Sequence, residues 1–435
     1  MADLAPFAGW TYDFDRVGGP EAVLAPPYDV ITADEAGRMA ASSPHHIIHL
    51  ILGKPAPGTE FGADVYARAA ETWRRWRREG VLRREPCPAL YTYDIEFDDL
   101  RTGGRWTRRG IMGALRLVPF EDREVLPHEE VFPGPLSDRI RLLEATDAAF
   151  CTIFALYSDP LDEAGAALAN APSEPLLTCT DARGCVHRVR RVRHPGAVAA
   201  VREALRKGPI IIADGHHRYT AALEHARRKG RLTHDGTGAR TLVCLSNTRD
   251  PGVRAYGTHR LFSGLGGPPN LDGLTAWARV ERIDAEGGES LLSALDDASA
   301  ADTSRVPAFV FLTSRGAFVV RIGKPEQCEG LLSAVHPVLR RQPLTLLHEV
   351  LLSHGLGLRA DQLDAAGGVS HTRDADEALR LVRAGACDLA VLVKAPAGED
   401  LSEVCSAGQR MPHKATYFYP KLLSGCVLMD LSERM

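Results

Sequence analysis

A short apolar run that ends in a glycine turn is the feature that most constrains how this chain can fold. Residues 210–213 are all apolar and are typical of a buried strand. Asp214 and Gly215 follow, and glycine accepts backbone angles that other residues resist. From Arg218 onward the pattern becomes helical and continues to Gly230. The sequence therefore predicts a strand, a tight turn and a helix start in immediate succession.

Such a turn is suited to hold an anion. The unpaired backbone N–H groups of a helix start and the positive end of the helix dipole point to the same place. His216, His217 and Arg218 add side-chain donors beside it, and an arginine can grip a phosphate with two hydrogen bonds. Adjacent histidines point in different directions and Arg218 would repel a cation, so phosphate is favoured over a metal ion. An incidental surface turn is the alternative.

Elsewhere the pattern predicts hairpins mixed with helices. Apolar and polar side chains alternate over residues 91–97, which indicates a strand with one wet face. Further strands are predicted at 47–52, 111–117, 308–312, 317–322 and 389–393, and helices over 64–80, 344–354 and 375–386. The six arginines between residues 74 and 84 are expected on the solvated side and end of the first helix. The expected fold class is α+β, with mixed sheets, hairpins and flanking helices.

Glycine and proline gather at residues 263–269, which predicts an internal boundary. This boundary divides the chain into an α+β domain over 1–265 and a C-terminal α+β region over 266–435. A length of 435 residues allows two or three domains at roughly 150 residues each.

Charge and hydropathy exclude several classes of protein. The 52 basic and 56 acidic side chains give a net charge of −4, which disfavours a nucleic-acid-binding surface. No stretch approaches ~18 consecutive apolar residues, so no membrane span is expected. The nine cysteines lack C-x-x-C spacing, which fits reduced thiols and disfavours a structural zinc site. A cytoplasmic protein with a small-molecule substrate is expected.

A proline-held loop at residues 126–130 presents a candidate general base. His128 and Glu129 are the residue types needed to remove a proton from a hydroxyl group, and a polar surface loop is the alternative. Shortly after it, Asp138 is predicted to cap a helix. Arg139 is expected either to reach a ligand or to pair with an acid.

Three other segments carry candidate ligand contacts. Two prolines stiffen residues 25–30 and would hold Tyr28 and Asp29 in place, although a stiff turn with an exposed acid is equally compatible. His259 and Arg260 form a second cationic cluster or part of a hydrogen-bonded loop. Residues 411–421 combine aromatic side chains with lysines, so this segment either sets Lys414 and Lys421 against phosphate or anchors the C-terminus.

Two resemblances follow from these motifs. The segment IADGHHRYTAAL at 212–223 resembles the phosphate-binding turn of the ParB/sulfiredoxin superfamily, and especially that of its free-serine kinases. The second resemblance covers nearly the whole chain. It rests on this segment together with the motifs APPYDVI at 25–31, LPHEEVF at 126–132, DRIRLLEAT at 138–146, THR at 258–260 and MPHKATYFYPK at 411–421. By these motifs and their order, the chain is identified as a member of domain-of-unknown-function family 1015.

The resemblances imply a nucleotide site and an association with serine metabolism. The leading hypothesis is a kinase that uses ATP or ADP with Mg²⁺ to phosphorylate a hydroxyl, with free serine as the suggested acceptor. Gly215 and the turn amides would hold phosphate, Asp214 would bind Mg²⁺ and Glu129 would accept the proton. The remaining candidates are His216, Arg218, Tyr219, Thr220, His259, Arg260, Lys414 and Lys421 for the nucleotide, and Tyr28, Asp29, His128 and Arg139 for the substrate. The expected catalytic residues are Glu129, Asp214 and His217.

Two alternatives remain at this stage. A phosphatase acting on phosphoserine or a related ester would use the same turn, with His216 or His217 as nucleophile or acid. A nucleotide-sensing or DNA-associated binding protein is the other, and the acidic net charge weakens it. The kinases of the superfamily place a catalytic glutamate in a compact domain before the turn. Here the upstream region is longer, so spacing does not assign the equivalent acid.

Overall fold

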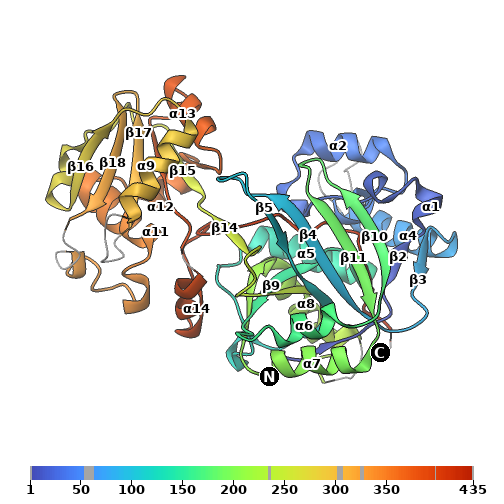
Figure 1. Ribbon diagram of the computed structural model, residues 1–435. Helices are drawn as coiled ribbons and strands as arrows, with labels where there is room; N and C mark the ends of the chain where they lie inside the picture. Colours follow the sequence, from blue (N-terminus) through green and yellow to red (C-terminus); the bar gives the residue numbers. More distant parts are fainter. Residues whose placement is uncertain are drawn as a thin grey trace. The chain divides into compact units, whose positions relative to one another are not determined.

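The computed structural model describes residues 2–52, 63–233, 237–300, 307–323, 328–396 and 398–433. The chain divides into two compact units, which are called unit 1 and unit 2 below (Figure 1). Unit 1 consists of residues 1–127, 131–254 and 420–435, and unit 2 consists of residues 128–130 and 255–419. The sequence places a boundary at 265/266. A division there would separate residues 259–262 from the sheet to which they belong, so the observed division lies earlier, after Arg254.

Unit 1 is built on a ten-stranded mixed sheet, in which the main path runs β10-β11-β4-β6-β13-β9-β12-β7. β9 and β13 are parallel, as are β7 and β12, and the other paired strands are antiparallel. The strands are β1 (Leu4–Ala5), β4 (Leu90–Asp98), β5 (Arg105–Arg108), β6 (Ile111–Arg116), β7 (Val125–Leu126), β9 (Ile153–Tyr157), β10 (Ser173–Thr180), β11 (Val186–Val192), β12 (Ile210–Asp214) and β13 (Arg240–Asn247).

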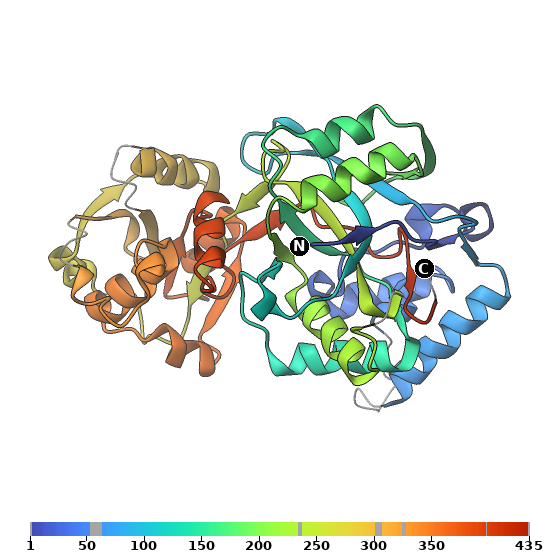
Figure 2. The same ribbon diagram turned by 90° about the horizontal axis from the view of Figure 1, so that it is seen from below.

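Helices cover both faces of this sheet. The pair α6–α7 and the pair α5–α8 lie on opposite sides of it (Figure 2). The helices are α1 (Phe14–Val17), α2 (Ala33–Ser42), α3 (Ile48–Ile51), α4 (Ala63–Arg78), α5 (Pro133–Thr146), α6 (Glu163–Ala169), α7 (Pro195–Leu205) and α8 (His216–Arg228), with 3₁₀ turns η1 (Pro20–Ala22), η2 (Tyr28–Val30), η3 (Phe120–Asp122) and η4 (Thr237–Ala239). Two short ladders join β2 (Trp10–Tyr12) to β3 (Leu82–Arg84) and β8 (Ala148–Ala149) to β22 (Met429–Asp430).

Unit 2 contains an antiparallel sheet of six strands in the order β16-β18-β17-β20-β15-β19. Its strands are β15 (His259–Phe262), β16 (Ala278–Ile283), β17 (Ala308–Thr313), β18 (Gly316–Ile322), β19 (Val369–Thr372) and β20 (Leu389–Leu392), and β14 (Arg254–Tyr256) pairs with β21 (Tyr417–Tyr419). The helical segments are η5 (Leu271–Ala276), α9 (Gly288–Ala300), η6 (Pro337–Leu339), α11 (Pro343–Thr345), the π-helix η7 (Leu346–Gly355), α12 (Ala360–Ala365), α13 (Ala375–Arg383) and α14 (Gly398–Ser406). Apolar side chains of α9, α13, β17 and β20 form one core.

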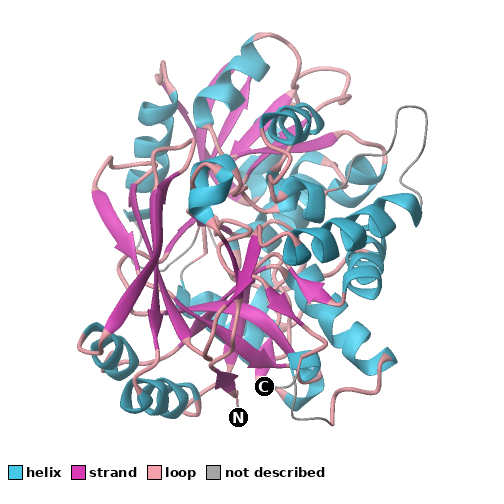
Figure 3. Cartoon of the chain, turned by 90° about the vertical axis from the view of Figure 1, so that its right-hand side faces the viewer, coloured by secondary structure: helices cyan, strands magenta, loops and turns pink. Residues whose placement is uncertain are grey.

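These elements confirm the predicted α+β class, and Figure 3 distinguishes the helices from the strands. The predicted strand at 91–97 is β4, whose buried and partly exposed residues alternate, and the predicted hairpin at 308–322 is β17–β18. The first predicted helix is α4, and Val65, Ala69, Trp73 and Trp76 are all buried on one face. Period and turn chemistry are local properties, which is why sequence patterns identify these elements.

Two local predictions are wrong. Residues 47–52 were expected to form a strand, but they contain the helix α3, because an apolar run this short fits a buried strand or a buried helix equally well. Asp138 does not cap a helix, because α5 begins earlier with Pro133 at its first turn. The Asp138 carboxylate instead accepts a hydrogen bond from the hydroxyl of Tyr66 at 2.8 Å.

Most arginines of the 74–84 segment form ion pairs within unit 1. Arg74 and Arg78 pair with Glu71, Arg77 with Asp430, Arg83 with Asp13 and Arg84 with Glu433. All nine cysteines are free thiols. None of the helices that the structure describes is long and apolar enough to span a bilayer.

Candidate functional site

The predicted strand–turn–helix unit is present in unit 1. β12 is buried and ends at Asp214, and α8 begins at His216, two residues earlier than the sequence pattern indicates. Gly215 lies between them with φ +96°, and no side chain caps the helix. The first intrahelical bond runs from the N–H of Tyr219 to the carbonyl of Gly215 at 3.0 Å. A helix start of this kind has the backbone polarity that favours an anion.

Only glycine fits at position 215. Its φ lies in the left-handed region, which L side chains rarely adopt. A Cβ atom there would also lie 2.7 Å from Nε of Arg218, because the arginine side chain folds back over the turn. The local sequence therefore sets both the turn and the position of the guanidinium.

Asp214 is held between two cations. One carboxylate oxygen accepts from Nη2 of Arg218 and the other from Nζ of Lys421, and Arg218 also donates to the carbonyl of Thr152. The side chains of Arg218, Asp214 and Lys421 are only 8%, 14% and 15% exposed. All three were expected to bind a nucleotide or its Mg²⁺, and the structure brings them together in direct contact.

The electrostatics keep this set ionised. Burial by itself raises the pKa of Asp214, but Lys421 and Arg218 outweigh it and hold the pKa well below its usual range. Burial likewise lowers the pKa of Arg218, and the charge of Asp214 more than compensates, so the pKa is raised. Asp214 is therefore a carboxylate and Arg218 a cation at neutral pH.

The two histidines of the motif lie differently. His216 is 4% exposed. Nε2 of His217 accepts a hydrogen bond from the backbone N–H of Phe132 at 2.9 Å, and the two rings are stacked with centroids 6.2 Å apart. Because Nε2 accepts, the ring proton of neutral His217 is on Nδ1.

Tyr219 and Thr220, which were expected to bind the nucleotide, are placed by the helix. Tyr219 is fully buried, its hydroxyl donates to the carbonyl of Val118 at 2.9 Å, and it accepts from the N–H of Val118 at 3.1 Å. The Tyr219 hydroxyl therefore donates to and accepts from the buried backbone of Val118. The hydroxyl oxygen of Thr220 is buried and has no hydrogen-bond partner among the residues that the structure describes.

The APPYDVI segment contributes to the surroundings of Arg218. After burial and the charge of Asp214, the charge of Asp29 contributes to the raised pKa of Arg218. Burial raises the pKa of Tyr28 to about 12, so its hydroxyl stays protonated at neutral pH. The Arg139 guanidinium lies 3.9 Å from the centroid of the Tyr28 ring and donates to the carbonyl of Ile51. Tyr28, Asp29 and Arg139 are therefore part of unit 1, as is the turn.

Three residues near the turn were missed by the sequence analysis. The first is Thr152, whose carbonyl accepts a hydrogen bond from Arg218. The second is its neighbour Cys151, whose sulfur accepts a hydrogen bond from the hydroxyl of Ser424 at 3.2 Å. Arg108 is 2% exposed, and its guanidinium lies 4.4 Å from the centroid of Phe154, the strand partner of Asp214. Nothing in the local sequence around Arg108 marks it, because its place depends on the pairing of distant strands.

The other predicted residues belong to unit 2. His128 is buried, its Nε2 lies 2.9 Å from Oγ1 of Thr416 and 3.6 Å from Oε1 of Glu129. The Glu129 side chain is 21% exposed. His259 is also buried and its Nδ1 accepts from the N–H of Val393 at 3.3 Å. Arg260 and Lys414 lie in the same unit and contact each other, as described below.

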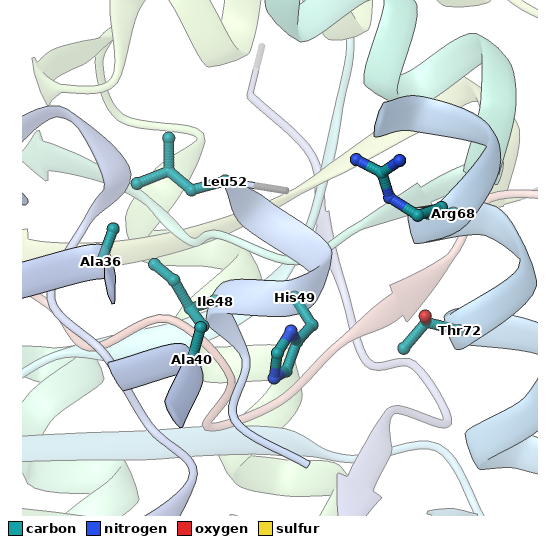
Figure 4. A pocket seen from close by; sticks show the side chains of 7 residues that line it. All are labelled: Ala36, Ala40, Ile48, His49, Leu52, Arg68 and Thr72. Atoms are coloured by element: carbon teal, nitrogen blue, oxygen red, sulfur yellow. The ribbon is translucent and has the colours of Figure 1, made fainter. Parts of the chain in front are cut away.

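A separate pocket of about 220 Å³ lies between α2, α3 and α4 of unit 1 (Figure 4). It is lined by Ala36, Ala40, Ile48, His49, Leu52, Arg68 and Thr72. Its walls contain none of the predicted site residues. A smaller hollow of about 20 Å³ includes Arg139, which is room for about one water molecule.

The described residues include no group of three or more His, Cys, Asp or Glu side chains that could hold a metal ion. Both carboxylate oxygens of Asp214 accept hydrogen bonds from the cations Arg218 and Lys421. A metal ion could bind Asp214 only if Arg218 or Lys421 released its carboxylate oxygen.

Comparisons with known proteins complete the description. A family model described as "Protein of unknown function (DUF1015)" matches residues 4–341, and no curated protein matches the chain. Among solved structures, a free serine kinase in complex with AMP is 13% identical with a TM-score of 0.33, covering 68% of this chain and 83% of that one. A conserved hypothetical protein from Pyrococcus furiosus is 14% identical with a TM-score of 0.31, covering 68% and 87%. SbnI with a C-terminal truncation, from Staphylococcus aureus, is 12% identical with a TM-score of 0.34, covering 73% and 86%.

Proposed function

The chain belongs to the DUF1015 family, whose function is unknown, and we propose that it is a nucleotide-dependent kinase that phosphorylates a hydroxyl group of a small molecule. ATP or ADP is the proposed donor. Free serine is the proposed acceptor, because the segment at 212–223 resembles the turn of the free-serine kinases. Phosphoryl transfer depends mainly on positioning and on neutralising negative charge.

The observation that carries this proposal is the buried set of ion pairs at the start of α8. Arg218 and Lys421 together bring two positive charges to one carboxylate, Asp214. A nucleotide phosphate would compete with Asp214 for both cations, and the helix start would add backbone donors. Binding would then be an exchange of anionic partners, with Gly215 leaving the backbone accessible.

The same exchange would prepare Asp214 for Mg²⁺. This ion is usually held by one or two carboxylates together with substrate phosphates. Asp214 alone fits that role once Arg218 and Lys421 bind the nucleotide phosphate in place of its carboxylate. Bound Mg²⁺ would neutralise charge on the transferred phosphoryl group. Asp214 in its present contacts offers no oxygen that is not already paired with a cation.

Glu129 is the proposed acceptor of the hydroxyl proton. A carboxylate is a suitable general base, and the imidazole of His128 lies 3.6 Å from it. His128, Tyr28, Asp29 and Arg139 are proposed to contact the substrate. Glu129 belongs to unit 2, and its role is tested separately from nucleotide binding in the Discussion.

Contacts of the histidines and arginines weigh against the two alternatives. Nε2 of His217 is used as an acceptor from Phe132 and His216 is buried, which favours a binding role over that of a phosphatase nucleophile. Most arginines of the 74–84 segment are paired with acids, so that this segment offers less positive charge to DNA than its sequence indicates.

Phosphorus NMR on the purified full chain tests the proposal. With Mg²⁺, serine and ATP or ADP, we expect nucleotide to be consumed and phosphoserine to form. Phosphoserine alone is the second arm, and release of inorganic phosphate without nucleotide would favour the phosphatase. A thermal-shift series gives the binding step: nucleotide at 100 times its dissociation constant should stabilise the fold by ~2.7 kcal/mol. Absence of any shift with ATP, ADP or AMP would overturn the proposal.

A further inference from the structure

Unit 2 contains a group of basic side chains that lies outside the ion-pair set on which the proposed function rests. Arg260, His371, Arg373 and Lys414 form this group, which we call the unit 2 cationic cluster. β15 and β19 are antiparallel neighbours, and their register places Arg260 opposite His371. Lys414 lies in a turn at 412–415, which the N–H of Ala415 closes onto the carbonyl of Pro412 at 3.1 Å.

Arg260 is buried, and no carboxylate of the described residues lies within ion-pair distance of it. It is 1% exposed, and its guanidinium donates only to backbone carbonyls: those of Thr258, His413 (2.7 Å) and Lys414 (3.2 Å). Its Nε has no hydrogen-bond partner among the described residues. Burial lowers the pKa of Arg260 to about 10. The charge of Glu129 offsets part of the cost of burial, while the direct contacts of the guanidinium are with carbonyl groups. A further anion nearby would lower this cost.

Lys414 and Arg373 are exposed to solvent, and the backbone carbonyl of Lys414 accepts a hydrogen bond from Arg260. Among the described residues, neither has a carboxylate within ion-pair distance; Nζ of Lys414 lies 3.5 Å from Nδ1 of His371, and the Arg373 guanidinium lies 3.6 Å from the ring centroid of Tyr417. Burial and then the charge of Arg260 lower the pKa of Lys414. Arg373 adds to this shift, and the charges of Asp364 and Glu129 offset only part of it. Positive charges therefore crowd one another here.

His371 completes the cluster as a neutral side chain. Burial and then the charges of Lys414 and Arg260 lower the pKa of His371 to about 3. The ring of His413 lies 6.2 Å from that of His371, between centroids. Two imidazoles beside two exposed cations give an anion several donors from different directions.

We propose that the unit 2 cationic cluster binds the phosphate group of a small-molecule ligand, with Lys414 and Arg373 as direct donors and with Arg260 as the residue that positions the 412–415 turn. Arg260 would do so through the carbonyls of His413 and Lys414. An ammonium group and a guanidinium group are suited to bind the oxygens of a phosphate, which carries up to two negative charges. The inference does not rest on the proposed nucleotide site, since none of its residues belongs to the ion-pair set of Asp214, Arg218 and Lys421 in unit 1.

Lysine acetylation of the full chain, followed by mass spectrometry, tests the site directly. The probes are inorganic phosphate, phosphoserine and ADP, with acetate at equal ionic strength for comparison. At about ten times its dissociation constant, a bound phosphate should slow the acetylation of Lys414 about ten-fold. Lys394, an exposed lysine of the same unit that pairs with Asp296, should react at an unchanged rate. Unchanged Lys414 reactivity with all three phosphate probes would overturn the inference.

Lys421 separates this inference from the proposed function, because it reports on the turn in unit 1. If only Lys421 is protected, the unit 2 site is overturned and the kinase proposal stands. If only Lys414 is protected, the kinase proposal is overturned and the unit 2 site stands. Calorimetry with inorganic phosphate supplies the second test. K414M should keep the melting temperature and bind phosphate about ten-fold more weakly, as expected for one lost charged contact. Affinity equal to that of the control variant K394M would overturn the assignment of Lys414.

Discussion

Asp214 and Lys421 lie 207 positions apart in the chain and form a buried ion pair. The pair ties the segment 420–435, which ends the chain, to the end of β12 in unit 1. Arg218 contacts the other oxygen of the same carboxylate, so that a local and a distant cation meet at the start of α8. Any anionic ligand at this helix start has to compete with the Asp214 carboxylate for these two cations.

Replacing Lys421 with methionine tests both the stability and the binding function of the pair. Lys421→Met leaves Asp214 with Arg218 alone, so we expect the free energy of unfolding to fall by about 2 kcal/mol, less than for a carboxylate left with no partner. Nucleotide affinity should fall about ten-fold or more, because one of two phosphate-binding cations is lost. Chemical denaturation and a calorimetric titration with ADP measure the two effects.

The control for this variant is K207M. Lys207 forms a surface pair with Glu163 in the same unit and is exposed, so K207M should change neither the stability nor the affinity measurably. Equal ADP affinity in the K421M and K207M variants would contradict the proposed role of Lys421.

Gly215→Ala separates backbone strain from the position of Arg218. The alanine would have to adopt φ +96°, and its Cβ would lie 2.7 Å from Nε of Arg218. We therefore expect the free energy of unfolding to fall by about 2–3 kcal/mol and nucleotide binding to weaken. Gly230→Ala is the matched control at the other end of α8. Its φ is +66° with nothing within 4 Å of the added atom, so strain alone should cost about 1 kcal/mol and affinity should be unchanged. Identical losses in both variants would show that the contact with Arg218 is unimportant.

The turn at 214–218 could be predicted because its signals are local. An apolar run, a glycine and a helical pattern follow one another directly, and each restricts the backbone on its own. The same holds for β4 and α4, whose periods of 2 and 3.6 residues expose one face. The segment 47–52 lacks such a period, and there the choice of strand was wrong.

The contacts that give the site its charge could not be predicted, since they depend on how distant segments pack. Lys421 was assigned to phosphate from its motif, but its pairing with Asp214 needs the C-terminal segment to return to unit 1. Arg108 reaches the ring of Phe154 only through the pairing of strands across the sheet. In unit 2, the register of β15 against β19 sets Arg260 opposite His371, and no sequence spacing indicates this.

Stability should depend on acid pH through Asp147. Burial raises its pKa, but hydrogen bonds from His225 (2.8 Å) and Arg231 outweigh burial and lower the pKa well below the usual range. A carboxyl group with a lowered folded pKa contributes fully above its unfolded pKa of about 3.9, and this contribution is lost as pH falls through the folded value. Asp147→Asn should therefore lower the free energy of unfolding by about 2 kcal/mol at pH 7.

The difference between wild type and D147N should shrink as the pH is lowered from about 5 to about 2, in urea titrations at each pH. Asparagine suits the backbone here, because Asp147 has φ +47° at the end of α5 and asparagine tolerates that region. A difference that stays constant over this pH range would mean that the charge of Asp147 does not contribute.

The proposed base is tested by Glu129→Gln, with Glu130→Gln as its neighbour control. The amide cannot accept a proton, so we expect the rate of phosphoryl transfer to fall about 100-fold or more while nucleotide affinity is retained. Glu130 is 68% exposed and pairs with Arg410 at 3.0 Å, and its variant should keep the wild-type rate. Single-turnover assays with serine and ADP-Mg²⁺ measure the step directly. If E129Q and E130Q transfer phosphate at the same rate, another group accepts the proton, and the kinase proposal would need a base from among the acids of unit 1, of which Asp29 lies near Arg218.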